Sequence, residues 1–191
     1  MLYHNPSDLN LTIEPHQSRQ LLLILDDYTQ PATVTVTLQE YSSVEILTWV
    51  AAIRNSAIPL TITIHHRGKE SKSQARVRSV LKGQTNNSFL GNVIIPSGAI
   101  NTESFLEYRA LLFDKARATA TPSLEIEEHP LKAGHAAAIG RVDEQQLFYL
   151  QSRGLTVEEA TQILTQGFFQ QLLDRVSDPA MQSEIARLVA A

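Results

Sequence analysis

The period of the hydrophobic pattern changes once along this chain, at Asp143. Before that residue, apolar or β-branched side chains alternate with polar ones, as in Thr33–Leu38 and Leu60–Ile64. Alternation of this kind is typical of strands with one buried face. After Asp143, apolar residues recur every three or four positions, which is the period of a helix. The sequence therefore predicts a mainly β domain over residues 1–142 and a small helical domain over residues 143–191.

The first domain contains roughly eight to ten short strands, a number typical of a sandwich, a barrel or a β-solenoid. Leu21–Leu25 is continuously apolar, which indicates a strand buried on both faces. Residues 43–53 fit either a strand or a short helix. Small polar residues at strand positions and the lack of Asn-Gly hairpin turns favour a solenoid over a sandwich. Further strands are expected at residues 9–13, 75–81, 89–95, 104–113 and 116–126.

The second domain has clear start and stop signals for its helices. Asp143 is a good N-cap, and Gly154 can adopt the left-handed conformation that ends a helix. Thr156 and Glu159 then form a capping-box pattern, so a second helix is predicted over residues 156–176. Asp178 followed by proline predicts a third helix that runs to Ala191. Inside the second helix, Gly167 suggests a close packing contact.

Composition excludes several classes of protein. The 20 acidic and 16 basic residues give a net charge of −4, which argues against nucleic-acid binding through bulk charge. The chain has no cysteine, so it cannot form disulfides or thiolate metal sites by itself. No apolar run is long enough to span a membrane, and the first residues lack the pattern of a signal peptide. We therefore expect a cytoplasmic protein that binds neither nucleic acid nor membrane.

No motif for enzymatic chemistry occurs in the sequence. Walker A, GxGxxG, HExxH and GxSxG patterns are absent, and the sequence shows no nucleophile with a general base at a recognisable spacing. We therefore predict no enzymatic activity. His65, His66 and Arg67 suggest a modest basic face together with Lys69, Lys72, Arg76 and Arg78. Alternation places His65 and His66 on opposite sides of a strand, which argues against a chelating pair.

Several segments resemble the SufB/SufD family, the scaffold components of the SUF iron–sulfur cluster assembly machinery. The resemblance covers about residues 74–176, where several motifs occur in the family's order and spacing. The segments are Gly91-Asn-Val-Ile-Ile-Pro-Ser-Gly-Ala99, Tyr108-Arg-Ala-Leu-Leu-Phe-Asp-Lys-Ala116, Pro122-Ser-Leu-Glu-Ile126, His135-Ala-Ala-Ala-Ile-Gly140 and Asp143-Glu-Gln-Gln-Leu-Phe-Tyr-Leu-Gln-Ser-Arg-Gly154.

The resemblance implies a right-handed parallel β-helix followed by a small C-terminal helical domain. It also implies that the helices dock an ABC-type ATPase, SufC, and that the β-helix pairs with a SufB-like subunit or with a second copy of the chain. The lack of cysteine favours SufD over SufB. We expect the helical anchors for the ATPase to be exposed apolar residues and their neighbours, from the set Phe148, Tyr149, Arg153, Gly154, Ile163, Leu164, Phe168, Phe169 and Leu172.

For the cluster, the resemblance matches His135 to the SufD histidine associated with assembly. Gly134 would present its ring in an exposed turn, and Glu125 or Glu127 would add an oxygen ligand. A transient iron–sulfur cluster would then be shared with a partner, which must supply any thiolate. The chain departs from the family around this histidine, at His129-Pro130 and at Ala133-Gly134.

Two other functions are compatible with the sequence. One is a β-solenoid interaction protein that keeps the ATPase dock but builds no cluster. The other is a β-helix enzyme that acts on polysaccharide, although the expected aspartate-rich calcium site is absent.

Overall fold

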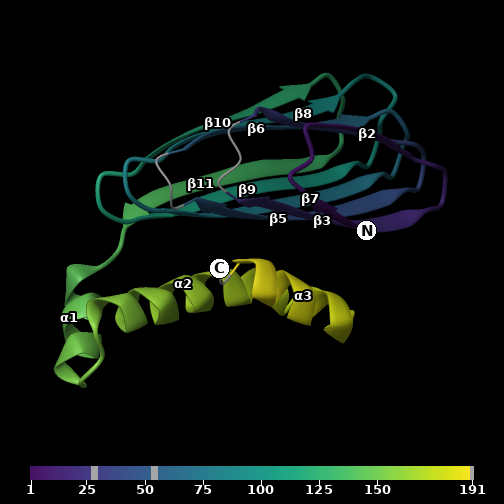
Figure 1. Cartoon of the computed structure of the whole chain (residues 1–191). Helices are drawn as coiled ribbons and strands as arrows, with labels where there is room; N and C mark the ends of the chain where they lie inside the picture. The colour runs from purple at the N-terminus through teal and green to yellow at the C-terminus, as the bar shows by residue number, and fades with distance from the viewer. Residues whose placement is uncertain (27–29, 53–55, 190–191) are drawn as a thin grey trace.

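The computed structural model describes residues 1–26, 30–52 and 56–189, which form two parallel β-sheets and three helices (Figure 1). Successive strands belong to alternate sheets, so the chain winds as a parallel β-solenoid. Sheet A contains, in spatial order, β1 (Leu2–His4), β3 (Ser18–Asp26), β5 (Ser43–Ala52), β7 (Lys72–Leu81), β9 (Glu103–Leu112) and β11 (Lys132–Arg141). Sheet B contains β10 (Arg117–Ile126), β8 (Asn86–Ile95), β6 (Ala57–His66), β4 (Ala32–Leu38) and β2 (Asp8–Ile13).

The coils stack in a regular register. In sheet A, Ser43 pairs with Lys72, Lys72 with Glu103 and Glu103 with Lys132, so successive coils are 29, 31 and 29 residues long. Paired residues of parallel strands lie on the same face of the sheet. Each column of register partners therefore points either into the solenoid or out of it along its whole length.

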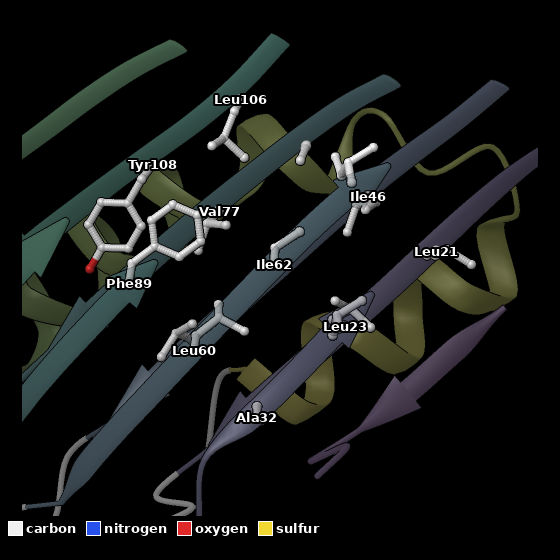
Figure 2. Close-up of a cluster of buried hydrophobic side chains, with 14 of the residues drawn as sticks. Leu21, Leu23, Ala32, Ile46, Leu60, Ile62, Val77, Phe89, Leu106 and Tyr108 are labelled. Atoms are coloured by element: carbon white, nitrogen blue, oxygen red, sulfur yellow. The ribbon is translucent and has the colours of Figure 1, made fainter. Parts of the chain in front are cut away.

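Aliphatic columns fill the space between the two sheets (Figure 2). Phe89 and Tyr108 stack there with ring centroids 4.8 Å apart. The Tyr108 hydroxyl donates to Asn87 Oδ1 at 2.5 Å, and burial raises the pKa of Tyr108 to about 12. Gly91 lies beside these rings, and a side chain there would collide with Phe89 and Leu106. The glycine is needed for space rather than for its backbone freedom.

One corner of the solenoid repeats the same backbone conformation in successive coils. His16, Tyr41, Glu70 and Asn101 each precede a sheet A strand by two residues and have φ between 54° and 60°. Each donates its N–H to the next coil, for example Tyr41 to the carbonyl of Lys69 at 2.9 Å. These hydrogen bonds between coils stabilise a left-handed conformation that is uncommon outside glycine.

The helices are α1 (Glu144–Ser152), α2 (Val157–Leu173) and α3 (Pro179–Val189). Their caps confirm the sequence prediction. Asp143 accepts a hydrogen bond from the Gln145 N–H, and Gly154 has a φ of +95°. Thr156 and Glu159 form a capping box. The predicted end of the third helix at Ala191 lies outside the described residues, and none of the described helices has the length and apolarity needed to cross a membrane.

The helices α2 and α3 cover the outer face of sheet A (Figure 1). A second hydrophobic core lies between these helices and sheet A, and it explains why Leu21–Leu25 is continuously apolar. Leu21, Leu23 and Leu25 point into the solenoid, whereas Leu22 and Ile24 point outward to the helices. Trp49 on the neighbouring strand is completely buried in the same helix-facing core.

Four predictions about local structure are decided by the fold. The ambiguous segment after residue 43 is strand β5, although its predicted end at Ile53 lies outside the described residues. Residues 132–141, which were not predicted as a separate strand, form β11. The predicted close packing contact at Gly167 is wrong, because a Cβ atom at this position would meet no other atom within 4 Å. The basic face is also wrong, because His66 points into the solenoid while Arg76 and Arg78 lie on sheet A.

Candidate docking surfaces

The helix α1 carries the most exposed aromatic residues of the described chain. No residue of α1 is buried, and Phe148 and Tyr149 are 71% and 56% exposed. On α2, Val157 and Ile163 are 47% and 45% exposed. Helix α1 packs on α2 and extends away from the solenoid (Figure 1). The two helices thus form an apolar arm, which we define as Phe148, Tyr149, Val157 and Ile163.

A shallow depression of about 500 Å³ lies between α1 and α2. Apolar and polar side chains both line it, a combination suited to a large hydrophobic side chain with hydrogen bonds around it. The lining residues are Asp143, Gln145, Gln146, Tyr149, Leu150, Ile163 and Leu164.

The turn between α1 and α2 holds two of the predicted partner residues in place. Arg153 is the C-cap of α1, and its guanidinium lies 5.2 Å from the centre of the Tyr149 ring. This cation–π contact orients the ring at the edge of the depression. Gly154, with its positive φ, reverses the chain direction before the α2 cap at Thr156.

Three other predicted anchors lie where α2 packs against sheet A, a contact that we call the seat of α2. Phe169 and Leu172 are 1% and 0% exposed, so they are not available to a partner on this surface. A charge at Phe169 would therefore fall in the contact between α2 and sheet A rather than on a free surface. Phe168 is half-buried, with its ring 5.9 Å from the Arg78 guanidinium. The helical period alone could not tell the face toward the solenoid from the face toward solvent.

A charged cluster borders this seat. Glu107 accepts from Arg78 at 3.1 Å and from Arg109 at 2.7 Å. Glu45 accepts from Arg175, which follows α2, at 2.7 Å. Burial lowers the pKa of the Arg78 guanidinium, and the Glu107 carboxylate opposes that effect. The Glu45–Arg175 pair ties the end of α2 to sheet A. This pair and the Arg78–Glu107 pair were not identified from the sequence, because their partners lie 130 and 29 residues apart.

The last coil, β10 and β11, leaves the end of the solenoid open. The inward column of Leu21, Ile46, Ala75 and Leu106 continues to His135. No further coil follows in the described chain, so His135 is exposed although it occupies a core column. Its neighbours Ala137 and Ile139 are also exposed, and Ile139 is 42% accessible. The open end thus presents an imidazole beside small and apolar side chains.

The structure corrects the predicted presentation of His135. His135 lies in the middle of β11 rather than in a turn. Gly134 does not have a positive φ, and a Cβ at this position would make ordinary contact with the Phe105 ring at 3.6 Å. The ring is exposed because the solenoid ends there, not because the backbone is unusual.

The predicted oxygen ligands do not lie with His135. Leu124 points inward, so Glu125 points outward from β10, and Glu127 follows the strand with its N–H bonded to the Ile95 carbonyl. Across residues 1–26, 30–52 and 56–189, no three His, Asp or Glu side chains are close enough to hold a metal ion. The described residues thus contain no complete ligand set for iron.

Comparison with known proteins identifies several relatives. A family model described as "SUF system FeS cluster assembly, SufBD core domain" matches residues 24–168. An iron–sulfur cluster assembly SufBD family protein of Mycobacterium leprae is 35% identical over 139 residues, which are 68% of this chain and 35% of that protein.

Two relatives are named SufD. The iron–sulfur cluster assembly protein SufD of Bacillus subtilis is 35% identical over 130 residues, 68% of this chain and 30% of the relative. SufD of Escherichia coli is 25% identical over 147 residues, 76% of this chain and 35% of the relative. The chain thus spans about a third of the length of these curated relatives.

Proposed function

Because this chain belongs to the SufB/SufD family of iron–sulfur cluster assembly proteins, we propose that it is a SufD-like scaffold subunit of the SUF system. It docks an ABC-type ATPase of the SufC kind through its helices and pairs with another scaffold subunit through the last coil. The observation that carries this proposal is the juxtaposition of two uncovered surfaces, the apolar arm and the open end of the solenoid, on either side of the 141–144 connection.

The apolar arm supports the ATPase dock. Phe148 and Tyr149 expose most of their rings, which is unusual for aromatic residues on a helix without a partner. Aromatic anchors surrounded by polar groups are characteristic of interaction hot spots. Of the other predicted anchors, Ile163 belongs to the arm and also lines the depression, Leu164 lines the depression, and Arg153 and Gly154 form the turn.

The dock is tested by charging the arm. The variants Phe148→Glu and Ile163→Glu should each weaken the binding of a SufC-like ATPase at least about tenfold in calorimetry, since one buried apolar side chain contributes about 1.5–3 kcal/mol. Gln151→Glu, an exposed polar position on α1, is the matched control and should bind normally. Unchanged affinity in both arm variants, with native circular dichroism, would contradict the dock.

The open end supports pairing between scaffold subunits. The outer edges of β10 and β11 lack strand partners in the described chain, and unpaired edges tend to be covered or paired in soluble proteins. The partner is a SufB-like chain or a second copy. Ala137→Lys should abolish the pairing in sedimentation without unfolding, because Ala137 is exposed on the inward column. Ser18→Lys, on the first part of β3, is the control.

His135 provides the link to cluster building. Its imidazole lies at the proposed pairing edge, where a second chain could bring thiolate ligands that this chain lacks. Glu125 and Glu127 would act as oxygen ligands only from the outer side of the solenoid. We expect His135→Ala to lower the cluster yield in anaerobic reconstitution with the ATPase and a SufB-like partner. His129→Ala, at an exposed histidine outside the strands, should leave the yield unchanged.

The second candidate, an interaction subunit that docks the ATPase without building a cluster, is favoured by one observation. His135 belongs to no group of three possible metal ligands among the described residues, so a partner would have to provide most of the ligand set. A cluster yield that does not respond to His135→Ala, with ATPase binding and pairing intact, would select this candidate.

A further inference from the structure

The two sheets of the solenoid differ in what covers their outer faces. Helices α2 and α3 lie on sheet A, and no described residue forms an element over the outer face of sheet B (Figure 1). Parallel sheets are usually covered on both faces, because both carry side chains suited to burial. The bare face of sheet B is therefore the surface whose composition is most informative.

The outward positions of the central strands of sheet B form an array in which uncharged polar side chains, mostly threonine, predominate. In the three central strands β4, β6 and β8, none of the outward residues is Lys, Arg, Asp or Glu, although 19% of the whole chain is charged. The charged outward residues of this sheet are confined to its two edge strands. The central positions are Thr33, Thr35, Thr37, Ala57, Pro59, Thr61, Thr63, His65, Asn86, Ser88, Leu90, Asn92 and Ile94.

Register places the threonines of this array side by side. Thr33 pairs with Thr61, and Thr35 pairs with Thr63. Asn92 on the next strand donates to Thr63 Oγ1 at 3.4 Å. Columns of β-branched side chains have few rotamers to lose, so they form a rigid surface of alternating methyl and hydroxyl groups.

The uncovered part of sheet A shows what a water-facing surface of this solenoid looks like. Its first column carries Lys72, Glu103 and Lys132 on adjacent strands, with Lys72 and Glu103 3.4 Å apart. Mixed charges of this kind keep exposed sheets soluble and separate. Sheet B has the same architecture and coil spacing but lacks these charges in its centre, so architecture does not explain the difference.

We propose that the outer face of sheet B is an isologous interface with a second copy of this chain. An uncharged surface offers no ion pairs to an acidic or basic partner, whereas the same face of a second copy is equally flat and equally uncharged. A twofold axis would set the threonine columns of the two copies against each other. This interface is distinct from the proposed pairing at the open end, which uses strand edges.

The size of the face sets the expected affinity. The thirteen central positions each occupy about 4.8 Å by 6.7 Å, which gives a patch of roughly 400–500 Å² per copy. The total buried area of roughly 800–1,000 Å² lies at the lower limit for specific interfaces. We therefore expect a weak dimer.

Single cysteines provide a direct test, because the chain has none of its own. Thr33→Cys, Thr61→Cys and Thr63→Cys, one at a time in the full chain, should each be cross-linked into dimers by a short bismaleimide at tens of micromolar protein. Ser18→Cys, on the first part of sheet A, is the control and should give no cross-linked dimer.

A charge-insertion series distinguishes this interface from the open end. Thr35→Lys and Thr61→Lys should each raise the dimer dissociation constant at least tenfold in sedimentation equilibrium and remove the cross-link at Thr63→Cys. Ala137→Lys should leave that cross-link unchanged. Cross-linking no greater than at Ser18→Cys would overturn the proposal. The proposal would also be overturned if Ala137→Lys abolished self-association while Thr61→Lys did not. It would equally be overturned if Thr61→Lys left self-association intact and weakened only the binding of a different subunit.

Discussion

At the scale of single residues, His66 shows how the solenoid accommodates a titratable group in its interior. The ring is completely buried, with Nδ1 2.7 Å from Ser71 Oγ and Nε2 2.8 Å from Ser73 Oγ. Ser73 in turn bonds Ser104 in the next coil at 2.8 Å. Burial lowers the pKa of the His66 imidazole to about 4, so the ring is neutral at pH 7 and its two hydroxyl partners satisfy both nitrogens.

This arrangement predicts a specific loss of stability in mild acid. In the unfolded chain the histidine pKa is near 6.5. Below pH 6.5 the unfolded state therefore binds a proton at this histidine that the folded state does not bind until the pH is near 4. The contribution is fully present above pH 6.5 and declines as the pH falls toward 4, by about 3 kcal/mol in total. His66→Gln should flatten this part of the pH profile in urea unfolding experiments between pH 4.5 and 8.

The neighbouring histidine is the control for this prediction. His65 lies on the outer face of the same strand, so His65→Gln should leave the pH profile as steep as in the parent protein. If the profile of His66→Gln is equally steep, the acid sensitivity comes from other groups.

At the scale of elements, the seat of α2 on sheet A joins the two predicted domains. Phe169, Leu172 and Trp49 belong to one buried hydrophobic cluster, and the Arg78–Glu107 ion pair borders it. The apolar residues of α2 are thus divided between this seat and the arm, although they are contiguous in the helical pattern.

Truncation on the two sides of the helix should therefore have different effects. Phe169→Ala should lower the free energy of unfolding by about 3–5 kcal/mol, because it opens a cavity in a fully buried site. Phe148→Ala, on the arm, should change it by less than about 0.5 kcal/mol. Guanidinium unfolding followed by Trp49 fluorescence measures both. Equal losses would show that the seat does not stabilise the protein.

At the scale of the whole molecule, the solenoid behaves as a stack in which each coil contacts only its neighbours. Strands β3 to β9 have partners on both sides, whereas β1, β2, β10 and β11 have one. Stability in such proteins is a sum of coil and interface terms, so it should decrease toward the uncovered ends.

Hydrogen exchange of the isolated chain at low concentration checks this gradient. Amides of β6 and β7 should exchange most slowly, and those of β2 and β11 at least about tenfold faster. Binding of a scaffold partner at the open end should protect β10 and β11 without changing β2. Uniform protection along the stack would contradict a nearest-neighbour description.

Much of the local structure of this protein could be predicted from short-range patterns in its sequence. Alternation in Thr33–Leu38 and Leu60–Ile64 predicted strands, and Asp143, Gly154 and the Thr156–Glu159 pair predicted where helices begin and end. These features depend on backbone conformation and on side chains within a few residues, so they can be read from neighbouring letters. The motifs over residues 91–154 also indicated the family and the solenoid.

The division of the apolar residues between surface and core could not be predicted in this way, because it depends on the tertiary structure. Phe168 and Phe169 are adjacent in sequence, but only Phe169 is fully buried, because sheet A lies on that side of α2. His135 is exposed in a core column for the opposite reason, since no coil follows to cover it. Burial depends on what packs from a distance along the chain, and the hydrophobic period of a segment carries no information about that neighbour.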